Sequence, residues 1–276
     1  MVQKIKKKLK IDKLGHTGTL DKFAEGLLIL PAGKATFFSD HFLKLEKSYN
    51  AQLELGIATL SGDPESEICE KRTKDEIDIF WDNPLNQISL KSELSGLIHW
   101  KEQDSPQISA LKWEGKRYSD LTRQGIATPQ KSRMIQIFDS SILDWKKESL
   151  WFSIDVSSGT YIRQIAIDIG KRMGFPIRLK SLIRTKVGNF NLNQAQKVDD
   201  LTLGNLKEIL DVLSYPKIVL SLQSEKEYIF HGRKIPHLPI ENLPWGTFFL
   251  VDDQSQLLAV CSKIENEDWK FLRVFH

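Results

Sequence analysis

The chain has 276 residues, of which 41% are hydrophobic and 27% charged, and its formal net charge is +3. This length allows one large or two smaller cores, and so mild a charge means that any polyanion site must come from local clusters of basic residues. The two cysteines, Cys69 and Cys261, form neither a metal-binding pattern nor a disulfide framework, which is typical of a reducing cytosol. The sequence shows no signal peptide and no membrane-spanning apolar run, so we expect a cytoplasmic protein without membrane contact.

The chain opens on five lysines between Lys4 and Lys10, a pattern more typical of a solvated helix face than of an RNA contact. The next segment reads Gly15-His16-Thr17-Gly18-Thr19-Leu20-Asp21 and precedes an apolar run. Its glycines permit tight turns and its threonine hydroxyls fasten them, so Asp21 is predicted to be a carboxylate with a fixed direction. Such a carboxylate serves as a nucleophile or general base, while the competing interpretation is an Asx-turn between two elements.

Further along, alternating apolar and polar residues predict half-buried strands at 49–55 and 150–156. Residues 65–87 are charged and poorly periodic, which indicates a surface connection containing one short helix. Apolar residues at helical spacing from Ile162 to Met173, with Gly174 after them, predict a helix. The mixture of strand and helix signals predicts an α+β fold.

The last quarter of the chain has a different character. Residues 201–213 read as a helix-like stretch, and Pro216 follows it. A hairpin from residues 248–251 and 257–260 and a closing strand at 271–275 predict a small β-barrel. We therefore predict two domains, at 1–213 and 216–276.

Five blocks of the sequence, in the family's order, resemble the signature of the TruB family of tRNA pseudouridine synthases. They are Lys13 to Asp21, Lys47-Ser48-Tyr49 with Leu55-Gly56, Ser109 to Lys112 with Gly115 and Tyr118, Gly159 to Arg163, and Leu182 to Thr185. The resemblance implies an α+β catalytic domain with a mixed, mostly antiparallel sheet and flanking helices, followed by a PUA-like RNA-binding β-barrel. It also implies a thumb-like loop at about 104–131 that closes over an RNA stem-loop.

The activity implied by this resemblance is the isomerisation of uridine to pseudouridine at position 55, in the T loop of tRNA, by a monomer. The reaction breaks the N-glycosidic bond and joins C5 of the base to C1′, so it needs no cofactor or metal. No dinucleotide fingerprint, Walker loop or zinc-spaced Cys/His set occurs in the sequence. The catalytic carboxylate, Asp21, attacks C1′, removes a ribose proton or adds to C6 of the base, and the sequence does not choose among these paths.

The resemblance also assigns roles to single residues. It implies that Asp21 is catalytic, that Arg163 is its ion-pair partner, and that Tyr49 stacks on the target uracil and assists proton loss at C5. It places Leu182 on the other face of the base and His16 at the space that a flipped base leaves. Further RNA contacts are expected from matched or thumb residues, namely Lys47, Tyr161, Arg184, Lys112, Lys116 and Arg117.

The sequence departs from the family pattern in three places. The family's first strand and its Lys-Pro-x-Gly turn are missing, so either the sequence is truncated or this member dispenses with the strand. The family's Asp-Pro-x-Ala-Thr-Gly reads Asp21-Lys22-Phe23-Ala24-Glu25-Gly26, and its Pro-Pro-x-Tyr-Ser-Ala reads Ser105 to Ala110. Because Asp21, Tyr49 and Arg163 are all present, we expect the catalytic chemistry to be intact.

Two other classes of function remain as alternatives. A non-catalytic RNA-binding or RNA-chaperone protein with a degenerate synthase domain has no need of Asp21, Tyr49 and Arg163 together. A glycoside hydrolase also attacks an anomeric carbon, but it ordinarily needs a second, acid-tuned carboxyl group. The nearest candidates for that group, Asp63 and Asp168, are interpreted as structural.

Overall fold

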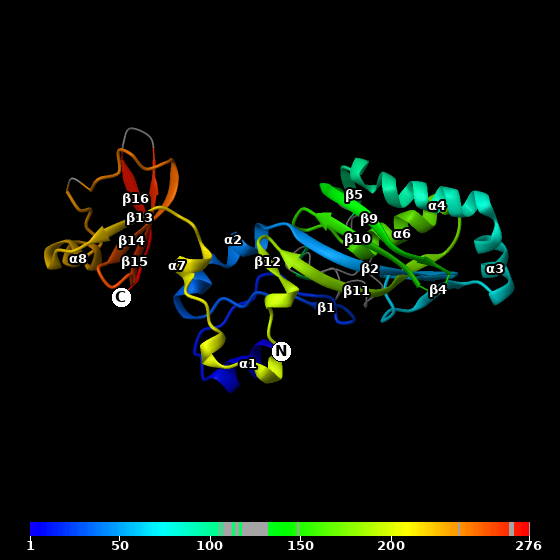
Figure 1. The fold of residues 1–276 in the computed structure, drawn as a ribbon, viewed down its shortest axis with the longest axis horizontal. Coiled ribbons are helices and arrows are strands. Elements are labelled where there is room, and N and C mark those ends of the chain that lie inside the picture. The colour runs from blue at the N-terminus through cyan, green and yellow to red at the C-terminus, as the bar shows by residue number, and fades with distance from the viewer. Residues whose placement is uncertain are drawn as a thin grey trace. The chain divides into compact units, whose positions relative to one another are not determined.

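The computed structural model describes residues 1–104, 106, 112–113, 116–117, 132–147, 149–236, 238–264 and 268–275 (Figure 1). Contacts divide the chain into two compact units, Met1–Val198 and Asp199–His276. None of the helices in the described ranges is both long enough and apolar enough to cross a membrane.

The first unit begins with α1 (Val2–Leu9), β1 (Glu25–Gly26), η1 (Gly33–Phe38), α2 (Ser39–Lys44), β2 (Lys47–Leu55), β3 (Ile57–Thr59), β4 (Ile68–Lys71), α3 (Lys74–Asp82), α4 (Pro84–Gly96), η2 (Leu97–His99) and β5 (Glu102–Asp104). It continues with β6 (Lys112–Trp113), β7 (Lys116–Arg117), β8 (Ser132–Met134), β9 (Ile137–Lys146), β10 (Ser149–Val156), α6 (Ile162–Met173), β11 (Ile177–Val187), β12 (Phe190–Asn191) and η3 (Leu192–Gln194).

The first unit is built on a six-stranded sheet with strand order β1-β11-β2-β10-β9, in which β12 also pairs with β11. Every pair is antiparallel except β1 with β11, so the sheet is mixed and mostly antiparallel, as predicted. The predicted strands at 49–55 and 150–156 lie next to each other at its centre, as β2 and β10. The register sets Tyr49 between Arg184 of β11 and Ile154 of β10.

One face of the sheet is covered by α6, with α4 packed beside it (Figure 1). The α6 helix has the predicted bounds, and Gly174 ends it in the left-handed conformation at φ 60°, where a glycine has no Cβ to strain. Its apolar stripe joins the fully buried side chains of the sheet, including Leu53, Phe152 and Ile165. This core fixes the first turn of α6, and therefore Arg163, against the sheet.

The charged connection after β3 contains more structure than predicted. Residues 65–87 include the strand β4, the whole of α3 and the beginning of α4, where one short helix was expected. Thr73 and Glu76 form a capping box that starts α3, and Asn83 caps α4 ahead of Pro84. Some apolar residues on these helices, such as Ile79, are exposed. They obscure the helical spacing of buried apolar residues from which a helix is predicted.

The elements of the second unit are η5 (Leu203–Asn205), α7 (Ile209–Val212), β13 (Lys217–Leu220), α8 (Gln223–Phe230), β14 (Gly246–Asp252), β15 (Leu257–Lys263) and β16 (Trp269–Val274). A further short turn of helix, η4 (Val198–Asp200), spans the boundary between the units. The predicted hairpin is β14 and β15, and the predicted closing strand is β16. The second unit has a core of its own, which includes the buried side chains of Phe248, Leu250 and Cys261.

Two predictions about this region are corrected. The described strands form one open sheet in the order β13-β14-β15-β16, so they do not make the closed barrel that was expected. Residues 201–213 form η5 and α7 rather than a continuous helix. The Thr202 and Asn205 side chains form a capping box around Leu203–Asn205, which limits that segment to a single turn.

The sequence places the domain boundary at 213 to 216, whereas contacts place it after Val198. The connecting segment joins the second unit in part because the Lys217 ammonium of β13 donates to the Leu210 carbonyl of α7, over 3.2 Å. The thumb-like loop predicted at about 104–131 falls mostly outside the described residues. Within it, β6 and β7 pair as a short antiparallel ladder.

Candidate active site

The glycine-bearing segment before Asp21 is held by backbone hydrogen bonds to the stretch that follows it. The Gly15 N–H donates to the Pro31 carbonyl over 2.9 Å, and the Gly33 N–H donates to the Lys13 carbonyl over 2.8 Å. The buried Thr17 hydroxyl donates to the Ile29 carbonyl over 3.1 Å. The segment is therefore a fixed loop, as the glycines and threonines predicted, and we call residues 13–26, which carry the candidate catalytic residue Asp21, the catalytic loop.

The loop brings Asp21 against the first turn of α6. The Nε of Arg163 donates to Oδ2 of Asp21 over 2.8 Å. The Arg163 side chain is only 5% exposed, whereas that of Asp21 is 38% exposed. The carboxylate is thus held by a buried guanidinium and still reaches the surface, where a reactant can approach it.

A second carboxylate shares the same guanidinium. One terminal nitrogen of Arg163 lies 3.2 Å from Oδ2 of Asp63 and donates to the Ser61 carbonyl over 2.9 Å. Asp63 is itself fixed, because its other oxygen accepts from the Glu65 N–H over 3.0 Å. Arg163 therefore bridges an accessible carboxylate and a buried one, and the two charges together exceed its own.

Tyr49 lies beside this pair on β2. Burial raises the pKa of its phenol, a hydrogen bond and the positive charge of Arg184 lower it, and the nearby negative charge of Asp21 raises it again. The net effect is an upward shift, so Tyr49 is a neutral phenol around neutral pH. Because residues directly opposite in an antiparallel pair share a face, Tyr49 and Arg184 project from the same side of the sheet.

Two cations that were expected to contact RNA are engaged by carbonyl groups of the protein. The buried Arg184 donates from Nε to the Leu27 carbonyl over 2.7 Å and from a terminal nitrogen to the Gly18 carbonyl over 3.3 Å. The buried Lys47 donates to the carbonyls of Leu43 and Leu45, and desolvation lowers its pKa to about 8, with the positive charge of Arg184 contributing. Arg184 therefore holds the catalytic loop at Gly18 and the residue that follows the loop, Leu27.

Tyr161 is the residue that caps the start of α6, just ahead of Arg163. Its backbone is gripped on both sides by the Gln103 side chain, which accepts from the Tyr161 N–H and donates to the Tyr161 carbonyl, each over 2.9 Å. The Arg133 guanidinium lies 5.5 Å from the centre of the Tyr161 ring and donates to the Gly159 carbonyl. These contacts fix the turn from which α6 begins.

The remaining predicted residues fall into three situations. Leu182 is buried on β11 opposite Ala51, on the same face of the sheet as Tyr49. His16 is exposed on the catalytic loop. The side chains of Lys112, Lys116 and Arg117 lie outside the description, although their backbones form β6 and β7.

Sequence reasoning missed three residues that shape this site. It treated Asp63 as structural, and it did not single out Gln103 or Arg133. The available signal for Asp63 was its position directly after Gly62, which has a φ of 76° in the turn that follows β3. Gln103 and Arg133 offered no comparable signal, because their partners are backbone groups far away in the sequence.

No group of three or more metal-ligating side chains occurs in the described ranges. The groups around Asp21 are a guanidinium and a phenol, which donate hydrogen bonds, and backbone carbonyls, which accept them, and this set suits a polar reactant. The arrangement holds a carboxylate in one orientation beside an aromatic ring.

Comparison with known proteins supplies an independent line of evidence. Residues 6–162 match the model of a family described as TruB family pseudouridylate synthase (N terminal domain). The chain is 41% identical to tRNA pseudouridine synthase B of Leptospira interrogans over 281 residues, covering all of this chain and 89% of that protein. It is 32% identical to the protein of the same name from Mycoplasma capricolum, covering 99% of this chain and 91% of that protein.

Among solved structures, the chain is similar to one in an archaeal box H/ACA sRNP Nop10-Cbf5 complex, with a TM-score of 0.58 and 18% identity. That alignment covers all of this chain and 81% of the other. A Cbf5-Nop10-Gar1 complex gives a TM-score of 0.59 with 20% identity. At such low identity these two likenesses concern the fold alone.

Proposed function

The chain belongs to the TruB family of pseudouridylate synthases, and from this premise we propose that it isomerises uridine to pseudouridine at position 55, in the T loop of tRNA. The family and the named relatives support the reaction and the kind of RNA. The observation that carries the proposal for this chain is the ion pair between the partly exposed Asp21 and the buried Arg163. A degenerate, purely RNA-binding relative has no use for that pair.

We assign the chemistry at the sugar to Asp21. The N1–C1′ bond must break, the uracil must turn while bound, and C5 must bond to C1′ before C5 gives up its proton and N1 gains one. Each of the three paths open to Asp21 starts from an ionised, correctly aimed carboxylate. Arg163 supports the second need, since its Nε donates to one oxygen of Asp21 and so fixes the direction of the carboxylate.

Tyr49 provides the aromatic surface in this proposal. Its ring stacks on the extracted uracil, and its neutral hydroxyl, which is hydrogen-bonded to Arg184, assists loss of the C5 proton. Leu182 contacts the other face of the base. The base is normally stacked within the loop, so the enzyme must extract it at a cost of a few kcal/mol.

The other predicted residues support binding. His16 occupies the space left by the extracted base, and Tyr161 borders the site next to Arg163. Lys47 and Arg184 shape the site through the carbonyls that they hold. Lys112, Lys116 and Arg117 contact the RNA backbone from a thumb-like loop at about 104–131.

At the level of the whole protein, we propose that residues 216–276 are a PUA-like domain within the second unit, and that the first unit, Met1–Val198, is the catalytic domain. We propose that the enzyme acts as a monomer in the cytoplasm and requires no cofactor.

Replacement of Asp21 by asparagine tests the assignment. Asp21→Asn keeps the shape of the side chain and removes its charge, so tRNA affinity should stay within a few fold of the wild type. Tritium release from C5-labelled uridine in tRNA should fall by about 10³-fold or more, as expected when a group that forms or breaks bonds is lost. Glu25→Gln, an exposed carboxylate of the same loop, serves as the control and should retain its rate. Near-normal turnover by Asp21→Asn would reject Asp21 as the catalytic carboxylate.

A further inference from the structure

The first helix carries positive charge that the active site does not use. In α1 and the residue after it, five lysines occupy seven positions, and no acidic residue interrupts them. Ile5 and Leu9 are buried on the inner face of the helix. The other faces are therefore covered with ammonium groups, and their high density calls for a reason beyond solubility.

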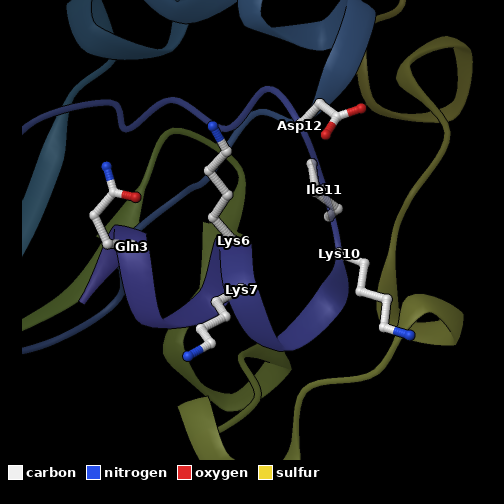
Figure 2. Close-up of a pocket in the computed structure, with 6 residues that line it drawn as sticks. All are labelled: Gln3, Lys6, Lys7, Lys10, Ile11 and Asp12. Carbon is white, nitrogen blue, oxygen red and sulfur yellow. The ribbon is translucent and has the colours of Figure 1, made fainter.

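Three of these lysines border one open hollow. It is lined by Gln3, Lys6, Lys7, Lys10, Ile11 and Asp12 (Figure 2). Figure 2 shows the side chains of Lys7 and Lys10 projecting from one edge of the helix and that of Lys6 from the other. Across the described residues, none of Lys6, Lys7 and Lys10 forms an ion pair, and we call these three the α1 lysine patch.

Lys10 occupies a position at which a lysine is unfavourable. It follows the last residue of α1 with φ 53° and ψ 40°, the left-handed conformation that glycine or asparagine adopts most readily. The Ile11 N–H closes the helix end on the Lys6 carbonyl over 3.1 Å. Lys10 thus adds its charge to the end of α1 despite the backbone conformation.

The cations nearest Asp21 are not available to bind phosphates. Arg163 is occupied by two carboxylates, and Arg184 and Lys47 by backbone carbonyls. The second unit offers little positive charge, because residues 199–276 contain eight Lys and Arg against twelve Asp and Glu. Phosphate binding must therefore draw on exposed cations of the first unit that lie outside the site.

The α1 lysine patch is separated from the catalytic loop by only two residues. Only Ile11 and Asp12 separate Lys10 from Lys13, and the Lys13 carbonyl is fixed by the Gly33 N–H. Leu14 forms a β-bridge with Ala32 immediately afterwards. The patch therefore lies directly before a fixed part of the catalytic loop along the chain.

From these observations we propose that the α1 lysine patch binds phosphate groups of the substrate tRNA outside its T stem-loop, an inference that rests on the proposed function. The patch adds affinity and steers encounter, since lysine–phosphate contacts release counterions and carry no sequence information. It takes no part in the chemical step.

The test compares two double variants that remove the same charge. Lys7→Gln/Lys10→Asn removes the two exposed charges of the patch. Asparagine is chosen at position 10 because it tolerates the left-handed conformation there. Lys71→Gln/Lys74→Gln is the control, with exposed lysines on β4 and α3. Dissociation constants are measured over a range of KCl concentrations with full-length tRNA and with an isolated T stem-loop, together with single-turnover rates at saturating RNA.

For full-length tRNA, the patch variant should bind several-fold more weakly at low salt, and the slope of log K against log salt should fall by about two. Its affinity for the T stem-loop and its saturated rate should match the wild type, as should every value for the control. An unchanged salt slope with full-length tRNA would overturn the inference, as would an equal loss with both RNAs or in the control. Wild-type protein that binds tRNA without forming pseudouridine would instead count against the proposed function.

Discussion

Arg163 serves two carboxylates whose surroundings differ. The Asp63 side chain is 11% exposed and is tied to the backbone of its own turn, whereas Asp21 is more than three times as exposed. The buried carboxylate therefore holds the guanidinium in place, and the accessible one is free to meet the substrate. Removing the charge of Asp63 should disturb the aim of Arg163 without touching RNA.

Asp63→Asn should lower the single-turnover rate by about 10- to 100-fold, because small displacements of a positioning group have effects of this order. The dissociation constant for tRNA and the melting temperature should change little. Asp168→Asn is the control, since Asp168 is another carboxylate of low exposure on the same unit but pairs with Gln164 and Lys171. A wild-type rate for Asp63→Asn would show that Arg163 needs only Asp21.

The two proposed roles of Tyr49 are separated by a pair of variants. Tyr49→Phe keeps the ring, and stacking on a base is worth ~1–3 kcal/mol, so tRNA should bind nearly normally while turnover collapses. Tyr49→Leu should weaken binding as well as turnover. The measurements are tRNA affinity, single-turnover rate and melting temperature. If Tyr49 only packs in the core, phenylalanine will be silent in all three and leucine will lower the melting temperature alone.

The contacts of single residues could be predicted from the sequence where those residues lie in motifs. The pairing of Asp21 with Arg163 followed from family resemblance, although 142 positions separate them. The engagement of Lys47 and Arg184 with carbonyls was not foreseen, because a lysine or arginine in a sequence gives no sign of whether its head group lies in water or beneath a loop.

Among the elements, the short strand β1 has the largest effect on the site. Its pairing with β11 runs parallel, with Gly26 opposite Arg184, and the Leu27 N–H donates to the Arg184 carbonyl over 2.8 Å. Gly26 has a φ of 107°, and a Cβ there would overlap the backbone of Arg184. Only glycine allows the catalytic loop to approach β11 this closely.

Gly26→Ala should therefore lower the free energy of unfolding by more than about 3 kcal/mol, since it combines backbone strain with a clash against main chain. Gly33→Ala is the control. Gly33 also has a positive φ, of 53°, but has open space around its Cα, so its substitution should cost only about 1 kcal/mol. Chemical denaturation of both variants gives the comparison. Equal losses would mean that the approach of the loop to β11 is not tight.

Elements with a clean period were predictable, and those with interrupted patterns were not. The α6 helix and the β2 and β10 strands each bury one face, so their alternation is visible. In β11 the register shifts after Leu179 and after Arg184, and each shift breaks the two-residue period. The prediction for the segment before β13 was wrong in the other sense, since a helix was expected where only short turns form. Its leucines are spaced like those of a helix, but a side-chain capping box ends the first turn.

On the scale of the whole molecule, the two units have separate cores, so they should respond separately to core damage. Ile165→Ala and Leu250→Ala each truncate a fully buried side chain, one in each unit. Either change should cost about 2–5 kcal/mol in its own unit. Calorimetry of the full chain should show each variant lowering a different part of the unfolding transition. A single transition displaced equally by both changes would show that the two units unfold together.

The distance in sequence between Asp21 and Arg163 also has a consequence for the newly made protein. During translation at about 5–20 residues per second, the ribosome releases Asp21 roughly ten seconds before Arg163, and β11 emerges later still. Until then the catalytic loop has neither its counter-ion nor the strand that anchors it. We expect a nascent chain to be inert toward tRNA, including the tRNAs that carry amino acids to its own ribosome, and to become active only after the whole first unit has left the exit tunnel.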